Sequence, residues 1–302
     1  MKLTILGCYA ATPRTYSNPT SQVLEINNEL VLIDCGEGTQ VELRRNKVRF
    51  SKIKHIFISH LHGDHFYGLV GLISSFSLLH REKELHVYGP KGIKEIITLQ
   101  LKLAKAWTSY PLYFHELDSR APQRILENDR ITVDTIPLDH RIYTNGFLFR
   151  ERPADRKLLI QEVEKYGIDK VYYRGIKKGK DATLEDGTII PNAALTQDPP
   201  APLSYAFCSD TAYNPALISQ ISHCTVLYHE ATFLQEHASV AAATKHSTAQ
   251  EAAQIASEAE VDRLILGHFS TRYDNFEYFR KEAAEFFQNV ELAEDGKIFE
   301  FL

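Results

Sequence analysis

The stretch of sequence that decides the fold is His60-Leu61-His62-Gly63-Asp64-His65, in which four of the six side chains are common metal ligands. It directly follows the apolar run Ile56-Phe57-Ile58-Ser59, which is typical of a buried strand. In an extended chain the first two histidines of the motif point to the same side. The glycine permits a turn that brings the aspartate and the last histidine back to that side. The motif therefore predicts a metal site in a loop that follows a strand.

The ligand types indicate which metal this site would take. Imidazole and carboxylate groups without a thiolate suit zinc, with manganese or iron as alternatives. Six residues cannot complete the coordination of two ions, so the motif predicts further ligands from distant parts of the chain. Three candidates also follow apolar runs: His140 after residues 135–138, Asp210 after residues 206–208 and His268 after residues 264–267.

Length and composition indicate a globular chain. Its 302 residues are 44% hydrophobic, which is enough for one large domain or two ordinary ones. A strand pattern over residues 2–7 leaves no room for a signal peptide, and no apolar run has the length of a membrane span. The four cysteines form no CxxC pair, so we expect no disulfide framework, a cytoplasmic protein and no membrane partner.

The charge pattern limits how the chain could bind nucleic acid. A net charge of -5 argues against a protein that coats nucleic acid with its whole surface, because that mode needs many phosphate contacts. Two basic windows remain as candidates for local contacts, although such runs are more often solvated faces. The first contains Arg44, Arg45, Lys47, Arg49, Lys52 and Lys54, and the second contains Lys170, Arg174, Lys177, Lys178 and Lys180.

Hydrophobic periodicity predicts alternating strands and helices in the first half of the chain. We expect a hairpin from residues 22–26 and 30–33, helices over 69–79 and 94–106, and a strand over 85–88. Further strands are expected over 131–137, 146–149, 204–208, 225–228 and 263–266. Thr248 and Glu251 predict a capping box at the start of a helix. Between about residues 151 and 202 the pattern breaks into charged and turn-rich pieces, which we interpret as an insertion.

Three motifs in the second half of the chain carry a resemblance to a known family. They are Phe207-Cys208-Ser209-Asp210-Thr211, His229-Glu230-Ala231-Thr232-Phe233 and His246-Ser247-Thr248. Together with the opening motif they resemble ribonuclease Z, the transfer-RNA 3′ endonuclease branch of the metallo-β-lactamase superfamily. The resemblance implies an α/β fold, with residues 1–302 forming a single αββα metallo-β-lactamase sandwich. It also implies a projecting substrate-binding arm inserted at about residues 151–202.

The resemblance further implies a ligand set and a reaction. His60, His62 and His140 would hold one zinc ion, Asp64, His65 and His268 would hold a second, and Asp210 would bridge them. Manganese or another divalent metal is the alternative. The expected enzyme is a zinc-dependent endoribonuclease that removes the 3′ trailer from precursor tRNA and leaves a 3′-hydroxyl on the tRNA. The resemblance implies attack by a metal-bound hydroxide, with Asp64 as an additional proton acceptor.

Two more residues are expected to assist the departure of the ribose 3′-oxygen. By resemblance, His246 would donate a proton to that oxygen and Glu230 would orient His246. In this context the basic window from Lys170 to Lys180 is expected to contact tRNA phosphates. The resemblance also implies a homodimer in which the arm of one subunit serves the active site of the other.

The chain departs from the family pattern in two places. Many short ribonuclease Z proteins carry a glycine- and proline-rich element in the arm, where this chain reads Tyr166-Gly167-Ile168-Asp169-Lys170-Val171-Tyr172. The N-terminal loop reads Pro13-Arg14-Thr15-Tyr16-Ser17-Asn18, where the family often has PxKxRN. Because that loop helps the family sense the nucleotides after the cleavage point, we expect altered treatment of precursors that already carry CCA.

Two other functions are compatible with parts of the sequence. Another hydrolase of the metallo-β-lactamase fold, such as a small phosphodiesterase, would share the metal core, since one fold hosts several chemistries. A hydrolase of small molecules has no use for a basic arm, and zinc β-lactamases with a cysteine ligand are disfavoured by Asp210. A non-catalytic RNA-binding protein would usually have lost ligands, whereas all seven candidates are present.

Overall fold

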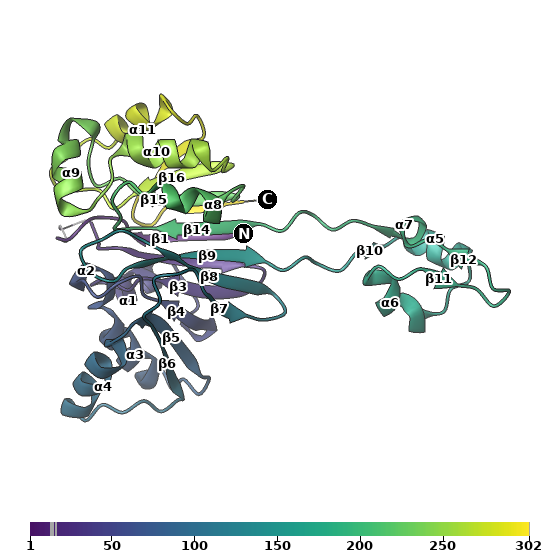
Figure 1. Cartoon of the computed structure of the whole chain (residues 1–302). Helices are drawn as coiled ribbons and strands as arrows, with labels where there is room; N and C mark the ends of the chain where they lie inside the picture. The colour runs from purple at the N-terminus through teal and green to yellow at the C-terminus, as the bar shows by residue number, and fades with distance from the viewer. Residues whose placement is uncertain (13–14, 16, 302) are drawn as a thin grey trace. The chain divides into compact units, whose positions relative to one another are not determined.

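Two seven-stranded sheets form the centre of the larger of the two compact units of the chain, residues 1–150 and 203–302 (Figure 1). The structure is a computed structural model that describes residues 1–12, 15 and 17–301. Pro13, Arg14 and Tyr16 of the N-terminal loop lie outside the described residues, as does Leu302. The expectation about CCA therefore stays a prediction from the sequence.

The first sheet has the strand order β18-β1-β2-β3-β4-β5-β6. Its strands are β1 (Lys2–Gly7), β2 (Ser21–Ile26), β3 (Glu29–Ile33), β4 (Ile53–Phe57), β5 (Leu85–Pro90), β6 (Leu112–Leu117) and β18 (Ile298–Glu300). The predicted hairpin of β2 and β3 is confirmed, and its turn residues Asn27 and Asn28 have φ values of 44° and 63°. Asparagine tolerates this left-handed conformation in two-residue turns. The strands from β3 to β6 are parallel, so their carboxyl ends lie at one edge.

The second sheet has the strand order β17-β16-β15-β14-β9-β8-β7. Its strands are β7 (Arg124–Glu127), β8 (Ile131–Pro137), β9 (Asn145–Glu151), β14 (Ser204–Cys208), β15 (Val226–Glu230), β16 (Arg263–Gly267) and β17 (Val290–Leu292). The strands from β14 to β17 are parallel, and β9 is antiparallel to β14. The carboxyl ends of β14, β15 and β16 consequently meet at one edge of this sheet.

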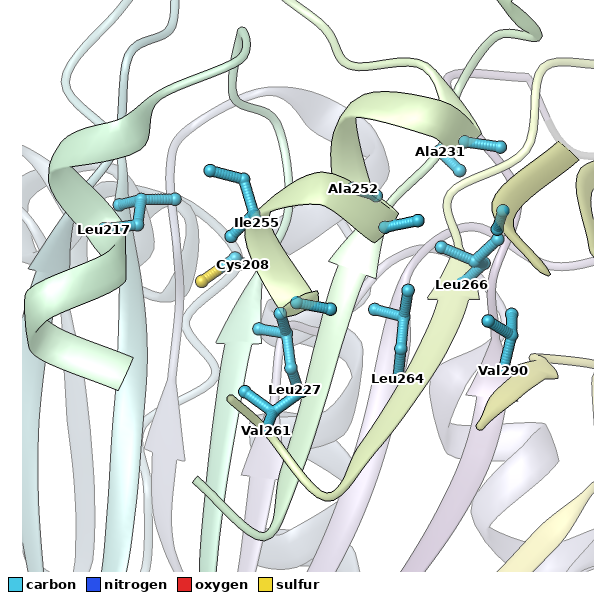
Figure 2. Close-up of a cluster of buried hydrophobic side chains, with 14 of the residues drawn as sticks. Cys208, Leu217, Leu227, Ala231, Ala252, Ile255, Val261, Leu264, Leu266 and Val290 are labelled. Carbon is cyan, nitrogen blue, oxygen red and sulfur yellow. The ribbon is translucent and has the colours of Figure 1, made fainter. Parts of the chain in front are cut away.

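Helices cover the outer face of each sheet, and apolar side chains fill the layers between them. The first sheet packs against α1 (Thr39–Arg45), α3 (Leu69–Leu78) and α4 (Ile93–Leu103). The second sheet packs against α8 (Ile218–Ile221), α10 (Ala249–Glu258) and α11 (Glu277–Ala284). Figure 2 shows Ala252 and Ile255 of α10 above Leu227, Leu264 and Leu266 of the strands. A third cluster, which includes Phe57 and Phe147, fills the space between the sheets. The predicted αββα sandwich is confirmed.

The helices predicted over residues 69–79 and 94–106 and after Thr248 are present, within a few residues of the expected bounds. The capping box of α10 forms as expected: the Thr248 hydroxyl accepts from the Glu251 amide at 3.2 Å, and the Glu251 carboxylate accepts from the Thr248 amide at 2.9 Å. The short edge strands β6, β7, β17 and β18 were not predicted, because they are partly exposed and their short apolar stretches follow no clear strand pattern. In the described part of the chain, no helix has the length and apolar character needed to cross a membrane.

The chain divides into two compact units. Residues 1–150 and 203–302 form unit 1, and residues 151–202, the range expected for the inserted arm, form unit 2. The elements of unit 2 are β10 (Lys157–Leu158), α5 (Ile160–Lys165), η2 (Lys170–Tyr172), α6 (Tyr173–Lys177), β11 (Ala182–Thr183), β12 (Ile189–Ile190), α7 (Asn192–Leu195) and β13 (Thr196–Gln197). Val163, Ile176 and Leu195 lie in a small apolar core of its own. Unit 2 is therefore a folded element rather than a loop.

Candidate active site

Strand ends from both sheets bring the candidate ligands together at one edge of unit 1. His60 follows β4, His140 follows β8, Asp210 follows β14 and His268 follows β16. The chain after His60 turns into the short helix α2 (Gly63–Phe66), which carries Asp64 and His65. Because parallel strands end at a common edge, segments far apart in the sequence converge there.

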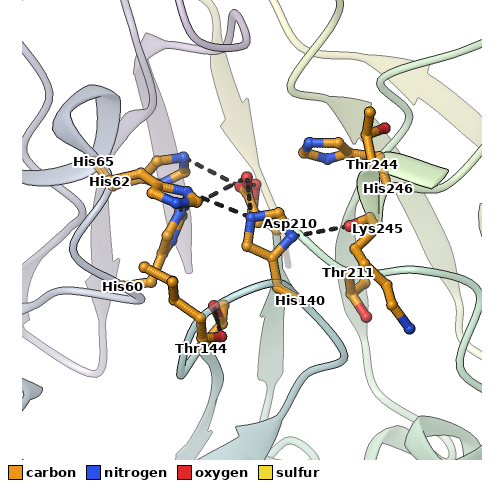
Figure 3. Close-up of polar contacts among 12 residues, drawn as sticks. His60, His62, His65, His140, Thr144, Asp210, Thr211, Thr244, Lys245 and His246 are labelled. Carbon is orange, nitrogen blue, oxygen red and sulfur yellow. Dashed lines mark hydrogen bonds and ion pairs between the residues drawn. The ribbon is translucent and has the colours of Figure 1, made fainter. Parts of the chain in front are cut away.

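The first group of candidate ligands consists of His60, His62, His140 and Asp210. Nδ1 of His62 lies 2.9 Å from Nε2 of His60 and 3.4 Å from Nε2 of His140. Oδ1 of Asp210 lies 3.8 Å from Nε2 of His60 and 3.8 Å from Nε2 of His140. All four ligand atoms are within 4.8 Å of one another. Three imidazoles and a carboxylate oxygen thus face a common point (Figure 3).

The second group consists of Asp64, His65 and His268. Oδ2 of Asp64 lies 3.5 Å from Nε2 of His65 and 3.8 Å from Nε2 of His268. Oδ2 of Asp210 lies 3.1 Å and 3.3 Å from the same two nitrogens. Asp210 therefore turns one oxygen towards each group, which is the arrangement that a carboxylate needs to bridge two cations.

In His140 and His65, hydrogen bonds on the side of the imidazole ring that faces away from the other ligands determine which nitrogen carries the proton. Nδ1 of His140 lies 2.9 Å from the carbonyl oxygen of Lys245, which can only accept, so Nδ1 is protonated and Nε2 keeps a lone pair. Nδ1 of His65 likewise lies 2.6 Å from Oδ2 of the Asp34 carboxylate. These contacts hold the rings in the tautomer that a metal ligand requires.

The two histidines of the second group test whether the site suits a metal. The Thr232 hydroxyl donates to Oε2 of Glu230, so its oxygen accepts from Nδ1 of His268 at 2.9 Å. The Nε2 lone pair of His268 therefore points at the site. Nε2 of His65 and Nε2 of His268 are both buried without a hydrogen-bond partner, and the oxygens nearest to them belong to carboxylates. Lone pairs that face carboxylate oxygens in a buried site are stabilised by a cation between them, so the residues present fit a divalent metal.

Asp34 is a site residue that was not predicted from the sequence. It directly follows β3 and is fully buried. Its carboxylate accepts from the Ser59 amide at 2.7 Å, the Ser59 hydroxyl at 2.8 Å and Nδ1 of His65 at 2.6 Å. The Ser59 oxygen lies 3.0 Å from Nδ1 of His60, so one carboxylate orients two ligand rings. Its position at the end of a strand beside β4 is the same signal that pointed to Asp210.

Several site residues adopt a backbone conformation that is uncommon outside glycine. Asp34, Asp210 and His268 have φ values of 55°, 62° and 58°, and the left-handed region costs such residues about 1–2 kcal/mol. The conformation turns the chain sharply where the strands end. A Cβ atom on Gly267 would lie 2.1 Å from the Tyr228 hydroxyl, so only glycine fits the position before His268.

Glu230 and His246 are in direct contact. Oε1 of Glu230 accepts from Nδ1 of His246 at 2.9 Å and from the Thr211 amide at 2.7 Å. Oε2 accepts from the Thr232 hydroxyl at 2.5 Å and from the Ser247 amide at 3.1 Å. Burial opposes a charge on His246, but Glu230 outweighs it and raises the pKa of His246 to about 9. His246 is therefore protonated at neutral pH and is held beside the ligand groups.

The carboxylates of the site favour positive charge among the candidate ligands. Burial opposes ionisation of Asp210, but His268, His65 and His60 hold its pKa well below the usual range. Burial also opposes a charge on His65, yet Asp210, Asp34 and Asp64 raise the pKa of His65 well above its ordinary value. One ligand atom each of Asp210, His246 and His268 also lies within 4.8 Å of the others, so the charged His246 ring stands directly beside the carboxylate of Asp210.

The five basic residues predicted in the arm all lie in unit 2. Lys170 is in η2, Arg174 and Lys177 are in α6, and Lys178 and Lys180 follow that helix. Their side chains are exposed. Nδ2 of Asn192 donates to the backbone carbonyls of Ile176 at 2.7 Å and Lys180 at 2.8 Å, which holds this basic segment in a defined conformation.

Curated relatives match almost the whole chain. The ribonuclease Z of Bacteroides fragilis is 44% identical over 98% of this chain and 97% of its own. The ribonuclease Z of Bacteroides thetaiotaomicron is 43% identical over 98% of this chain and 93% of its own. The chain belongs to the ribonuclease Z family. The family expected from the HEATF and HST motifs is therefore confirmed.

Solved structures agree with the fold of a ribonuclease Z. The short form of human tRNase Z matches with a TM-score of 0.72 and 26% identity over 99% of both chains. The metallo-β-lactamase fold protein YhfI of Bacillus subtilis matches with a TM-score of 0.69 and 19% identity, which supports the fold alone. A family model described as "Anti-Pycsar protein Apyc1" matches residues 1–159, a range that includes His140 but ends before Asp210 and His268. Membership in the ribonuclease Z family, together with the His/Asp cluster, implies that the site uses divalent metal.

Proposed function

We infer that this chain is a metal-dependent endoribonuclease that removes the 3′ trailer from precursor tRNA. The observation that carries the inference is a pair of ligand groups joined by Asp210, in a chain that is 44% identical to a ribonuclease Z over nearly its full length. The ligand chemistry favours zinc, and two groups favour two ions. Precursor tRNA as substrate makes the cytoplasm the expected location.

The ligand groups suggest a role for each candidate ligand. His60, His62 and His140 would hold one ion, Asp64, His65 and His268 would hold the other, and Asp210 would contact both. Bound divalent ions would activate water and offset the negative charge that builds up on the phosphodiester. The arrangement of Asp34, Thr232 and the Lys245 carbonyl supports these roles, because the three groups fix the rings of His65, His268 and His140.

The proposed reaction is hydrolysis with two proton transfers by residues of this chain. A water oxygen forms a bond to phosphorus while its proton passes to Asp64, whose Oδ2 is held by the Ala11 amide at 2.9 Å. The bond from phosphorus to the ribose 3′-oxygen breaks, and that oxygen takes a proton from Nε2 of His246. The products are a tRNA with a 3′-hydroxyl and a trailer with a 5′-phosphate.

His246 suits the role of general acid because Glu230 prepares it in two ways. The carboxylate fixes the orientation of the ring through Nδ1, which leaves Nε2 free for the substrate. It also raises the pKa of His246, against the effect of burial, to about 9, so the proton is present at neutral pH. The Thr211 and Ser247 amides in turn hold Glu230 in place.

Replacement of His246 by alanine tests the general acid. We expect His246→Ala to lower kcat for precursor tRNA by about 10²–10⁴-fold, as is typical of losing such a group, and to leave the metal content unchanged. His237→Ala is a matched control, since His237 hydrogen-bonds Tyr273 at 2.8 Å and belongs to neither ligand group. Loss of metal together with activity would identify His246 as a ligand, and an unchanged kcat would exclude it as the acid.

The five exposed basic residues of unit 2 are the proposed tRNA-binding part of the arm. Phosphate contacts of this kind position a folded RNA without reading its sequence. A homodimer, in which the arm of one subunit serves the other subunit's active site, is the assembly we propose. Sedimentation of the free enzyme at several concentrations would test it, and a monomer at all concentrations would contradict it.

Assays on two substrates in parallel distinguish the proposed activity from the alternative functions. Cleavage of a precursor tRNA at the 3′ end of the acceptor stem supports the endoribonuclease. Hydrolysis of a small chromogenic phosphodiester without cleavage of the RNA would indicate a small phosphodiesterase instead. Binding of the RNA with neither reaction, in metal-loaded protein, would indicate a non-catalytic RNA-binding protein.

A further inference from the structure

A second basic surface lies on unit 1, away from the ligand groups. Three adjoining cavities of about 200, 620 and 800 Å³ surround the chain around η1 (Phe50–Lys52). The cavities are contiguous, because each pair of them shares lining residues, among them Lys47, Lys52 and Lys83. Nine lysine and arginine side chains line them, against four glutamates. We name it the entry surface, because its central residues lie where the chain enters β4. It is locally positive in a chain whose net charge is -5.

The charges at the centre of the entry surface are not neutralised by the protein. Lys47, Arg49 and Lys52 are exposed, and among the described residues no carboxylate forms an ion pair with them. Lys54, at the margin, differs because its Nζ lies 2.8 Å from Glu84. Three uncompensated cations in adjoining positions repel one another, so a bound polyanion would relieve that repulsion.

Arg81 adds a fixed positive charge beneath this surface. It is 8% exposed, and it donates to the carbonyls of Lys83 at 2.7 Å, Ile53 at 2.8 Å and Glu84 at 2.7 Å. Its guanidinium lies 4.9 Å from the ring centre of Phe76, and within the described chain it has no carboxylate partner. Arg81 thereby ties the starts of β4 and β5 together and contributes charge that the solvent screens only weakly.

The entry surface occupies the edge of the sheets opposite the ligand groups. Lys52 immediately precedes β4, whereas His60 follows it, and a strand of this length spans about 17 Å. Arg130, which precedes β8, lines the largest cavity and donates to the Asn28 carbonyl at 3.2 Å, so both sheets contribute to this edge. Since β9 is antiparallel to β14, the end of β9 and the start of β14 lie at one edge of their sheet.

We propose that the entry surface binds the phosphate backbone of the precursor tRNA, remote from the bond that is cut. This inference rests on the proposed function, which supplies the polyanion. Nucleic acid carries about one charge every 3.4 Å along each strand, so a strand that crosses the cavities brings several phosphates to the three unpaired cations. The surface is a separate contact from the basic segment of unit 2, and it acts on affinity rather than on the chemical step.

The test is the triple variant Lys47→Ala/Arg49→Ala/Lys52→Ala in the metal-loaded enzyme. Its kcat/KM for precursor tRNA is measured from low to high salt, beside hydrolysis of a small chromogenic phosphodiester. Loss of three phosphate contacts makes the slope of log kcat/KM against log salt shallower by about 2, at about 0.7 for each contact to a single strand. The change is expected in KM, with kcat and the small phosphodiester unaffected.

The matched control is Lys102→Ala/Lys105→Ala/Lys281→Ala, which removes the same charge from three other exposed positions of unit 1. The control is expected to keep the parent slope. A parent slope in the entry-surface variant, or an equal change in the control, overturns the proposal. Failure of the proposed function is a different result, because the parent enzyme would then not cleave precursor tRNA at all.

Discussion

Asp34 shows how one buried side chain can set the properties of several ligands. Its carboxylate holds Nδ1 of His65 directly and Nδ1 of His60 through the Ser59 hydroxyl. Both rings therefore present Nε2 to the site. Glu230 has a comparable position on the other side, where it holds His246 directly and His268 through the Thr232 hydroxyl.

Replacement of Asp34 by asparagine is expected to weaken metal binding by about 10–100-fold. The amide group of asparagine would meet Nδ1–H of His65 with a donor, which favours the other tautomer and removes the Nε2 lone pair. Competition with a chromophoric chelator measures the affinity, and circular dichroism checks the fold. Asp262→Asn, at an exposed position, is expected to bind metal like the parent. Parent affinity in Asp34→Asn would show that this carboxylate does not orient the ligand.

At the scale of elements, the stability of helix α10 depends on the hydrogen bonds of its first turn. The capping box of Thr248 and Glu251 satisfies amide groups that the helix itself leaves without partners. The buried face behind it, with Ala252 and Ile255, covers the strands that carry Asp210, Glu230 and His268 (Figure 2). The cap therefore supports the edge on which these residues lie.

Loss of the cap is expected to lower the free energy of unfolding by about 1 kcal/mol. This is the usual cost of replacing an N-cap threonine by alanine, and urea unfolding of Thr248→Ala would measure it. Ser257→Ala, an exposed substitution in the same helix, is the control and is expected to be close to neutral. Equal stabilities of the two variants would indicate that the box contributes nothing.

A row of imidazole rings crosses three adjacent strands of the first sheet and predicts a dependence of stability on pH. The ring of His55 on β4 lies 5.3 Å from that of His86 on β5, and His86 Nδ1 lies 2.9 Å from Nε2 of His115 on β6. Burial, with a smaller contribution from His86, lowers the pKa of His55 to about 3. Because its unfolded pKa is about 6.5, the stability that neutral His55 contributes is complete above that pH and is lost as the pH falls towards 3.

Replacement of His55 by phenylalanine is expected to remove this part of the acid sensitivity. Between pH 7 and pH 5 the parent should lose about 2 kcal/mol more than His55→Phe, at about 1.4 kcal/mol for each unit below 6.5. Urea unfolding of both metal-free proteins at the two pH values measures the difference. Nδ1 of His55 has no hydrogen-bond partner, so the phenyl ring leaves no polar group unpaired. Equal losses in the two proteins would contradict the assignment.

At the scale of the whole molecule, the chemical step is proposed for unit 1, whereas RNA binding is proposed for the basic segment of unit 2 as well as for the entry surface of unit 1. The ligand groups, Glu230 and His246 lie in unit 1, and the exposed segment with Lys177, Lys178 and Lys180 lies in unit 2. A small substrate needs only the ligand groups, Glu230 and His246, whereas precursor tRNA also needs the basic surfaces. The two activities should therefore respond differently to changes in unit 2.

The variant Lys177→Ala/Lys178→Ala/Lys180→Ala is expected to raise KM for precursor tRNA and to flatten its salt dependence by about 2 in logarithmic slope. Hydrolysis of a small chromogenic phosphodiester should stay at the parent rate. The control triple of Lys102, Lys105 and Lys281 again removes the same charge elsewhere. An unchanged salt dependence would make this segment a solvated face.

The sequence by itself determined which chemistry this protein carries. The spacing of His60 to His65, and the candidates at the ends of later strands, could be predicted because strand ends are marked by apolar runs that stop at polar residues. Most interior strands and the helices α3 and α4 followed from the apolar pattern, and α10 followed from its capping box. The edge strands β6, β7, β17 and β18 could not be predicted in this way, since they are half exposed and their pattern is weak.

Only the tertiary structure decided how those residues act on one another. No local pattern in the sequence links Glu230 to His246, which are sixteen residues apart, yet Oε1 of Glu230 lies 2.9 Å from Nδ1 of His246. The same is true of Asp34 and His65, which are thirty-one residues apart. The entry surface likewise needs residues before β4, β5 and β8 to meet at one edge. Parallel strands bring distant segments together at their ends, and the identity of each neighbour depends on strand order and register, which hydrophobic periodicity does not encode.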